Sequence, residues 1–389
     1  MQAMIESAAR PTSLRAGERL VGERRAGERL IGERPAARSP WLDARYAYAP
    51  RPADPRIDLA LDANEGRMLP AARRALDGLA ARAAGLSRYP SFTELEAAIA
   101  ERWGVEPGRV VATAGGDEAI ARVCASRLAP GAKLAVYEPA FPMFAAYGAS
   151  RGARAMGLSW ADGEDFPLRA SAELVSGCPS LGLLCLASPA NPTGAAAPAE
   201  AVLALAELCA ERGTAFLFDG AYAEFADEDP SVELAAGGGA YIVRTFSKAY
   251  GLAGLRVGYV IAPDADEAML LRAAGAPYPS SPLAAELALA GLGDEIGLSA
   301  AVRRVRDERE ELTAFLCAAG ARPQASQANF VFARVGDSGG LRDGMAELGI
   351  GIRAFAAPGL SDAVRISCPG DEADFSRLLR ALDSLRSFL

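Results

Sequence analysis

Lysine is almost absent from this chain, and its two lysines are the first residues to consider for chemistry. The sequence has 41 lysines and arginines together, and only Lys133 and Lys248 are lysines. A lysine amine can lose its proton and form a Schiff base with a carbonyl group, whereas an arginine guanidinium stays charged. A chain that favours arginine so strongly is expected to keep lysine where a nucleophilic amine is needed.

Further residues whose side chains or backbone amides could bind a ligand follow short apolar runs of the chain. They are Gly116, Asp117, Asn191, Asp219, Tyr222, Thr245, Ser247 and Arg256. Together with Lys248 they are the parts needed to hold pyridoxal phosphate. The amine would bind the aldehyde, a buried acid would keep the pyridine nitrogen protonated, and amide and phenol groups would fix the ring oxygen O3′. Hydroxyl groups, an arginine and a glycine-rich helix N-terminus would bind the phosphate.

The elements that must position these residues are visible as a regular alternation. Apolar runs that predict buried strands occur at 109–114, 133–137, 181–187, 215–219, 240–245 and 256–262. Helical patterns, such as those at 117–128 and 198–212, separate most of them. This alternation predicts a parallel or mixed sheet covered on both faces, whose ligands lie at the carboxyl ends of the strands.

The C-terminal third has a different pattern. A segment rich in proline, glycine and serine at 275–282 interrupts the alternation, and a long helical stretch follows at roughly 283–318. Two short strands are predicted near 329–334 and 363–367. These elements predict a second, smaller α+β domain.

The N-terminal residues 1–40 differ in composition and sequence pattern from the rest of the chain. Residues 15–34 hold a ten-residue unit that occurs twice with one exchange of valine for isoleucine. The unit has few aliphatic side chains and regularly spaced glycines, so it can bury little surface. We predict a disordered or weakly ordered arm over 1–40, with a docking or regulatory role as the alternative.

Composition excludes several classes of function. The chain has no histidine, which excludes catalytic triads, histidine acid–base catalysis and histidine-ligated metals, and no metal site is predicted. A net charge of −8 argues against a nucleic-acid partner. No apolar run is long enough to span a membrane or to act as a signal peptide. Six scattered cysteines without a C-x-x-C motif are typical of reduced thiols in a cytoplasmic protein.

Three motifs resemble a known family. They are N-P-T-G from Asn191, D-x-A-Y from Asp219, and S-K-A-Y-G-L-A-G-L-R-x-G-Y from Ser247. They resemble the class I/II aminotransferases of fold type I, and are most similar to the histidinol-phosphate aminotransferase family. The resemblance extends from about Leu59 to the C-terminus, in the family's order and spacing.

The resemblance implies an architecture and an activity. It implies an α/β fold with a large pyridoxal-phosphate-binding domain at 59–284, built on a mostly parallel seven-stranded sheet. The smaller α+β domain would combine 41–58 and 285–389. The implied enzyme is a cytoplasmic homodimer with shared active sites, which uses pyridoxal phosphate in amino-acid biosynthesis. It would transfer an amino group between an amino acid and a 2-oxo acid.

Roles on the cofactor side are carried over by position. Lys248 is expected to form the Schiff base and to move protons, and Asp219 to pair with the pyridine nitrogen. Asn191 and Tyr222 would bind O3′, with Asp219, Tyr222 and Lys248 forming the catalytic set. The expected phosphate ligands are Gly116, Asp117, Thr245, Ser247 and Arg256.

Two aromatic residues also match family positions. Phe141 stands where the family stacks an aromatic side chain on the cofactor ring. Tyr89 matches a tyrosine that reaches the phosphate of the neighbouring subunit's cofactor. This match is what implies a dimer whose subunits share their active sites.

The substrate side departs from the family pattern. Arg365 matches the arginine that binds the substrate α-carboxylate, and Arg353 matches the position that contacts the phosphate of histidinol phosphate. Asn64 opens N-E-G-R-M, where the family commonly has N-E-x-P followed by an aromatic residue. We expect Asn64 to contact substrate, and the donor to be an amino acid with a second anionic group, similar to histidinol phosphate.

The same set of residues is compatible with other reactions of this cofactor. A lyase, decarboxylase or cyclase of a specialised biosynthetic pathway would keep the same lysine, aspartate, asparagine and arginine. A non-catalytic binding protein on this fold is a third alternative, and the intact Lys248 and Asp219 argue against it.

Overall fold

The structure is a computed structural model that describes residues 40–42, 46–47, 54–78, 87–161 and 163–389. Residues 40–389 form one compact unit. Except for Pro40, the arm predicted at 1–40, with its duplicated segment, lies outside the described residues.

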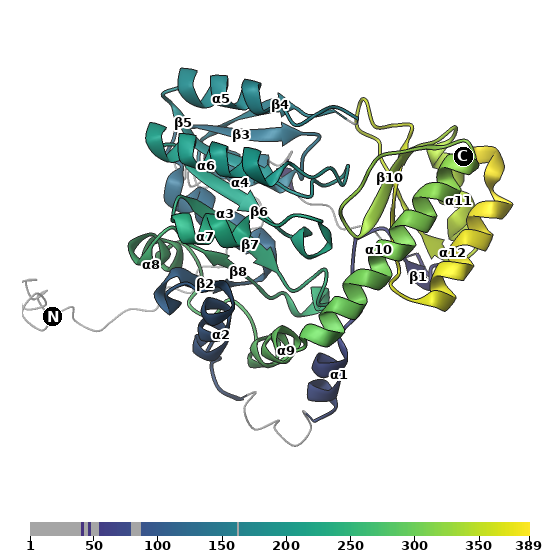
Figure 1. Cartoon of the computed structure of the whole chain (residues 1–389), viewed down its shortest axis with the longest axis horizontal. Coiled ribbons are helices and arrows are strands. Elements are labelled where there is room, and N and C mark those ends of the chain that lie inside the picture. Colours follow the sequence, from purple (N-terminus) through teal and green to yellow (C-terminus); the bar gives the residue numbers. More distant parts are fainter. Residues whose placement is uncertain (1–39, 43–45, 48–53, 79–86, 162) are drawn as a thin grey trace, which may run out of the picture. The chain divides into compact units, whose positions relative to one another are not determined.

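A seven-stranded sheet organises the first two thirds of the described chain (Figure 1). Its order is β2-β8-β7-β6-β5-β3-β4, and all neighbouring pairs are parallel except those that involve β8. The strands are β2 (Val110–Thr113), β3 (Lys133–Glu138), β4 (Arg154–Ser159), β5 (Leu181–Ala187), β6 (Ala215–Asp219), β7 (Ala240–Thr245) and β8 (Gly258–Ile261). The mostly parallel seven-stranded sheet predicted above is therefore confirmed.

Six of these strands coincide with the apolar runs of the sequence. Strands β2, β6, β7 and β8 are buried along their whole length, which explains why they carry apolar side chains on both faces. The seventh strand, β4, is an edge strand whose residues R-A-M-G-L-S are all at least partly exposed. It has no apolar run, so the periodicity did not reveal its place.

Helices cover both faces of the sheet, and each face has its own hydrophobic core. One core lies beneath α3 (Gly115–Arg127), α4 (Met143–Ser150) and α8 (Ala265–Ala273). The other contains residues of α2 (Thr93–Trp103), α5 (Leu168–Gly177), α6 (Ala199–Arg212), α7 (Ser231–Gly237) and α9 (Pro282–Leu292). Helix α1 (Pro70–Asp77) packs against α9. The single-turn 3-10 helices are η3 (Pro107–Arg109), η4 (Ala223–Phe225), η5 (Ala253–Leu255) and η6 (Arg386–Phe388).

The helical stretch predicted at 283–318 is two helices rather than one. Helix α9 ends at Leu292, and α10 (Glu295–Ala318) begins after Asp294. Asp294 is the N-cap, because its side chain accepts a hydrogen bond from the Gly297 amide. The sequence prediction missed this break, since glycine followed by aspartate interrupts the chain without interrupting the apolar pattern.

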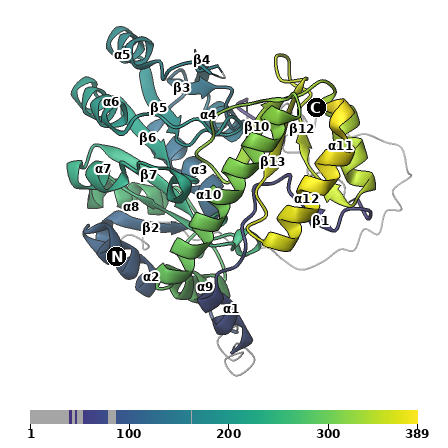
Figure 2. The same cartoon turned by 45° about the vertical axis from the view of Figure 1, so that its right-hand side comes forward.

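The C-terminal part contains a second sheet with a third hydrophobic core (Figure 2). This antiparallel sheet has the order β12-β13-β10-β9. Its strands are β9 (Arg322–Pro323), β10 (Phe330–Arg334), β12 (Arg353–Ala354) and β13 (Ala363–Ser367). Helices α11 (Ser338–Glu347) and α12 (Glu372–Ser384) pack with it. The strands predicted near 329–334 and 363–367 are β10 and β13.

One strand joins the N-terminal end of the compact unit to its C-terminal part. Strand β1 (Leu59–Ala60) pairs in parallel with β11 (Ile350–Gly351). We placed the start of the large domain at residue 59, whereas these two residues pair with the C-terminal part of the chain. The division into 59–284 and 41–58 with 285–389 otherwise stays a prediction. None of the described helices is both long and apolar enough to cross a membrane.

Candidate active site

Lys248 lies in the turn that follows β7, at the carboxyl edge of the large sheet. Its side chain is half-buried, and its Nζ donates a hydrogen bond to the carbonyl oxygen of Ala63 at 3.1 Å. The same nitrogen lies 5.6 Å from the centre of the Tyr222 ring. The amine therefore projects toward two segments that are distant from it in sequence.

Asp219 is the last residue of β6 and is only 8% exposed. Burial raises the pKa of its carboxyl group to about 6, and the hydrogen bond that it accepts from the Ala221 amide at 3.1 Å opposes this rise. Lys248 lies close enough to lower the pKa somewhat. A buried carboxylate whose charge is balanced by so few neighbours is suited to bind a cationic group. A protonated pyridine nitrogen is such a group.

Tyr222 is held by a buried network that the sequence did not reveal. Its Oη accepts a hydrogen bond from Asn64 Nδ2 at 3.0 Å, and Asn64 Oδ1 accepts one from Ser367 Oγ at 3.1 Å. Asn64 is 1% exposed and adopts a left-handed backbone conformation with φ of 55°. Both ends of its side chain are thus used within the protein, so the geometry supports a role in positioning Tyr222. Direct contact of Asn64 with substrate stays a prediction.

Asn191 and Arg365 come together from different sheets. Arg365 in β13 donates from Nη1 to Asn191 Oδ1 at 2.6 Å and from Nη2 to the Asp62 carbonyl at 2.8 Å. Asn191 lies in the loop after β5, at the same sheet edge as Asp219 and Lys248. The guanidinium is therefore anchored beside the edge that carries the other candidate residues.

The predicted phosphate ligands lie around the start of α3. Arg256 donates to Asp117 Oδ2 at 3.1 Å and to the Ala114 carbonyl at 3.3 Å. Thr245 Oγ1 donates to Ser247 Oγ at 2.9 Å and accepts from the Ser247 amide at 3.1 Å. Gly116 adjoins this group, because a Cβ at Gly116 would lie 3.9 Å from Thr245 Cβ. Amide groups at a helix N-terminus together with hydroxyls and a guanidinium can bind a phosphate.

Gly115 leaves room for the arginine of this group. Its φ is +78°, and a Cβ at this position would lie 2.6 Å from Nη2 of Arg256. A side chain at this position would push the guanidinium aside, and the positive φ would strain it. Glycine therefore suits the start of this helix.

The two predicted aromatic residues are placed differently from the rest. Phe141 is half-buried and lies edge-to-face against Phe144, with ring centres 6.2 Å apart. Tyr89 is 81% exposed and stacks on Tyr278 at 4.5 Å. The structure does not pair either ring with the residues described above, so their roles toward the cofactor stay predictions.

Arg353 lies beside Arg365 on the neighbouring strand. The two residues are directly opposite each other in the antiparallel pair of β12 and β13, so their side chains emerge on the same face. The guanidinium of Arg353 lies over the Phe355 ring at 5.6 Å. Two guanidinium groups on the same face of neighbouring strands can together bind an anionic group.

Two positions needed by this site were not singled out from the sequence. Ser367 is one, although it stands two residues after Arg365 and so lies on the same face of β13, which was a usable signal. Gly66 is the other, because a Cβ there would lie 1.9 Å from the carbonyl oxygen of Lys248. The chain after Asn64 therefore packs directly on the backbone of the lysine turn. No local pattern indicates that contact.

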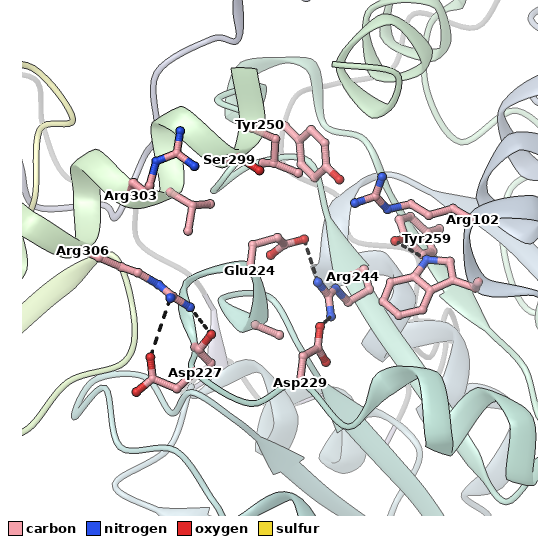
Figure 3. A pocket seen from close by; sticks show the side chains of 15 residues that line it. Arg102, Glu224, Asp227, Asp229, Arg244, Tyr250, Tyr259, Ser299, Arg303 and Arg306 are labelled. Atoms are coloured by element: carbon pink, nitrogen blue, oxygen red, sulfur yellow. Dashed lines mark hydrogen bonds and ion pairs between the residues drawn. The ribbon is translucent and has the colours of Figure 1, made fainter. Parts of the chain in front are cut away.

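A separate cavity of about 430 Å³ lies next to η4, the turn that follows Tyr222 (Figure 3). Arg244 at its wall is buried and forms ion pairs with Glu224 at 2.8 Å and Asp229 at 2.7 Å. Arg306 of α10 donates to the Phe225 carbonyl at 3.1 Å. These contacts fix η4 and the end of β7, and so they support Tyr222 and Lys248 from outside the site. No group of acidic or cysteine side chains among the described residues is arranged to bind a metal.

Comparison with known proteins gives a consistent result. A family model described as aminotransferase class I and II matches residues 55–382. The histidinol-phosphate aminotransferase of Halorubrum lacusprofundi is 33% identical over 338 residues, which cover 86% of this chain and 91% of that protein. The corresponding protein of Roseiflexus castenholzii is 35% identical over 321 residues, covering 79% and 85%.

Solved structures agree with the sequence relatives. The histidinol-phosphate aminotransferase from Sinorhizobium meliloti in complex with pyridoxal-5′-phosphate superposes with a TM-score of 0.77 and 27% identity. The match covers 85% of this chain and 91% of that chain. Aspartate aminotransferase from Thermus thermophilus, at 22% identity and a TM-score of 0.69, shares the fold.

Proposed function

We propose that this chain, which belongs to the family of class I and II aminotransferases, acts on an amino donor that carries a phosphate group, as in histidinol phosphate. The chain is a pyridoxal-phosphate-dependent aminotransferase of fold type I, which acts on an amino acid and a 2-oxo acid. The relatives and neighbours named above are aminotransferases, and none favours the lyase, decarboxylase or cyclase alternative. The substrate class and the roles of individual residues are our proposal.

The observation that carries the substrate class is the direct opposition of Arg353 and Arg365 in the small sheet. Arg365 is held by Asn191 and by the Asp62 carbonyl, which fixes its guanidinium beside the edge of the large sheet that carries Lys248. Arg353 stands one strand further out on the same face, about 5 Å away between Cβ atoms. The phosphate of such a donor would lie within reach of two arginines on one face of the small sheet.

The residues present fit the cofactor. Pyridoxal phosphate, when bound, supplies the aldehyde that receives the amino group and a protonated ring that withdraws electrons from the bonds at the substrate Cα. Asp219 supplies a buried carboxylate whose pKa of about 6 leaves it ionised at neutral pH, ready to pair with a cationic ring nitrogen. Gly115 keeps the start of α3 open for Arg256, and the helix amides and nearby hydroxyls complete an anion site.

Two side chains would act directly on the reacting groups. Lys248 Nζ would hold the aldehyde carbon. It would also carry a proton between the substrate Cα and the cofactor, because among the described residues it is the only lysine at this edge of the sheet. Tyr222 Oη already accepts a hydrogen bond from Asn64, so its own proton is free to be donated to the ring oxygen O3′. Asn64 and Ser367 keep that hydroxyl in place.

We further propose that the enzyme is a cytoplasmic homodimer of amino-acid biosynthesis. Support for a dimer comes from Tyr89 and Tyr278, two stacked aromatic rings that are 81% and 48% exposed. A second subunit that covered them would bring Tyr89 to the neighbouring cofactor. Support for the cytoplasm comes from the cysteines, all six of which are free thiols.

The test is a comparison of two donors that differ only in the phosphate. We expect the purified holoenzyme to convert histidinol phosphate with a 2-oxo acid acceptor. Arg353→Met should raise KM for histidinol phosphate about tenfold to a hundredfold, because this factor corresponds to the free energy of one lost charge-assisted hydrogen bond. The kinetics with unphosphorylated histidinol should stay unchanged. Arg322→Met, on the exposed strand β9, is the matched control and should change neither.

Two outcomes would overturn the substrate class. An equal rise of KM for both donors would show that Arg353 does not act on the phosphate. Turnover of amino acids that lack a phosphate, with no turnover of histidinol phosphate, would show that the substrate class is wrong.

A further inference from the structure

Lys133, the second lysine of the chain, lies at the edge of the large sheet opposite to Lys248. It is the first residue of β3, so it stands at the amino end of the parallel strands, whereas the candidate active site follows their carboxyl ends. Its Nζ lies 3.5 Å from Sγ of Cys178, the residue directly after α5. The catalytic proposal does not use this lysine.

The backbone holds the amine and the thiol together. The Lys133 amide donates to the Ser180 carbonyl at 2.9 Å, and the Leu181 amide donates to the Cys178 carbonyl at 2.9 Å. Lys133 and Leu181 are also paired in register between β3 and β5. The two side chains therefore emerge from segments that are hydrogen-bonded to each other. Cys178 is 8% exposed, more than Cys124, Cys185 or Cys209.

Cys178 differs from the other buried cysteines in its electrostatic surroundings. A contact with the Ser180 hydroxyl at 3.7 Å lowers the pKa of the Cys178 thiol, burial opposes this, and Lys133 lowers the pKa further. Burial instead raises the pKa of Cys124 and of Cys209 to about 12. Thiolate character is what makes a cysteine reactive toward peroxides, so Cys178 is the buried thiol poised for oxidation.

We propose that Cys178 and Lys133 form a redox-responsive pair that a hydroperoxide converts into a reversible covalent link. In the first step the Cys178 thiolate attacks hydrogen peroxide, the O–O bond breaks, and a sulfenic acid and a hydroxide form. In the second step that hydroxide takes a proton from the Lys133 ammonium group, the resulting amine attacks the sulfur, the S–O bond breaks, and the leaving hydroxide takes a second proton from the nitrogen to form water. Sulfur is oxidised and peroxide oxygen is reduced.

The product is a sulfur–nitrogen bond that a dithiol can reverse. The dithiol returns the thiol and the amine and becomes a disulfide. Only lysine among the basic residues of this chain can close such a link, because an arginine guanidinium does not lose its proton. This gives a reason for a lysine at position 133 in a chain that otherwise uses arginine.

The experiment uses the full-length holoenzyme treated with hydrogen peroxide and digested for mass spectrometry. We expect peptides that contain Lys133 and Cys178 to be joined, with a mass two hydrogen atoms below their sum, and to separate after dithiothreitol. Cys317, an exposed thiol elsewhere in the chain, is the internal reference for oxidation without a neighbouring amine.

Two variants separate the amine from its charge. Lys133→Arg keeps a positive charge, so Cys178 should still be trapped by dimedone as a sulfenic acid, but no link should form. Cys178→Ser should abolish both signals and leave Cys317 unchanged.

The proposal is wrong if wild-type Cys178 stays reduced while Cys317 reacts. It is also wrong if Cys178 accumulates sulfinic acid equally in the wild type and in Lys133→Arg. Because the measurement is the mass of modified or joined peptides, neither result depends on the aminotransferase activity.

Discussion

Replacing Asp219 by asparagine should stabilise the cofactor-free chain at neutral pH, although the same change should remove its activity. The carboxyl group is buried at the end of β6, and burial raises its pKa from 3.8 to about 6. A shift of roughly two pKa units corresponds to about 3 kcal/mol, at about 1.4 kcal/mol per unit. At pH 7 the folded cofactor-free chain therefore carries an unfavourable buried charge that an asparagine would lack.

The pH dependence of this effect has a definite sign. Between pH 3.8 and about 6 the folded chain holds a proton on Asp219 that the unfolded chain has lost, so the wild-type stability falls as the pH rises through this window. Asparagine does not titrate. The stability advantage of Asp219→Asn should thus be close to zero near pH 4 and reach about 3 kcal/mol at pH 7.

The assay is urea unfolding of the cofactor-free proteins at several pH values between 4 and 8. Asp383→Asn, a change at an exposed carboxylate on α12, is the control and should stay within about 0.5 kcal/mol of the wild type. Adding pyridoxal phosphate should stabilise the wild type more than the variant, because a cationic ring nitrogen compensates the carboxylate. A variant that is less stable than the wild type at pH 7 without cofactor, or an advantage that does not change with pH, would refute this reasoning.

Three further substitutions test the supports of the site. Arg244→Met should cost about 3 kcal/mol in urea unfolding, because it leaves two half-buried carboxylates without their guanidinium partner, and a loss below about 1 kcal/mol would contradict this. Ser367→Ala removes the hydroxyl that orients Asn64, so kcat should fall about tenfold with little change in KM, and an unchanged kcat would exclude the positioning role. Gly66→Ala would put a Cβ 1.9 Å from the carbonyl oxygen of Lys248, so cofactor occupancy measured by absorbance should drop. Gly177→Ala is the control, because Gly177 has open space around it, and it should leave the cofactor occupancy unchanged.

Much of the large sheet could be read from the sequence, because strands buried on both faces need apolar side chains at every position. The runs at 181–187 and 215–219 show this plainly, and each leads to a polar residue at the edge where ligands bind. The edge strand β4 carries exposed and half-exposed residues and gave no such signal. The break before α10 was also missed, because a glycine and an aspartate can end a helix while the apolar spacing continues.

The sequence by itself determined which residues could do chemistry, since lysine use, strand ends and motif order are local properties of the chain. The tertiary structure alone decided how they are supported. Asn64 and Ser367 are 303 positions apart and meet only when the N-terminal segment packs against β13. Likewise, Arg353 faces Arg365 only because of the register of two short strands, which no local pattern specifies. Contacts between distant segments arise from the packing of whole elements, and the residue spacing within a single motif does not predict that packing.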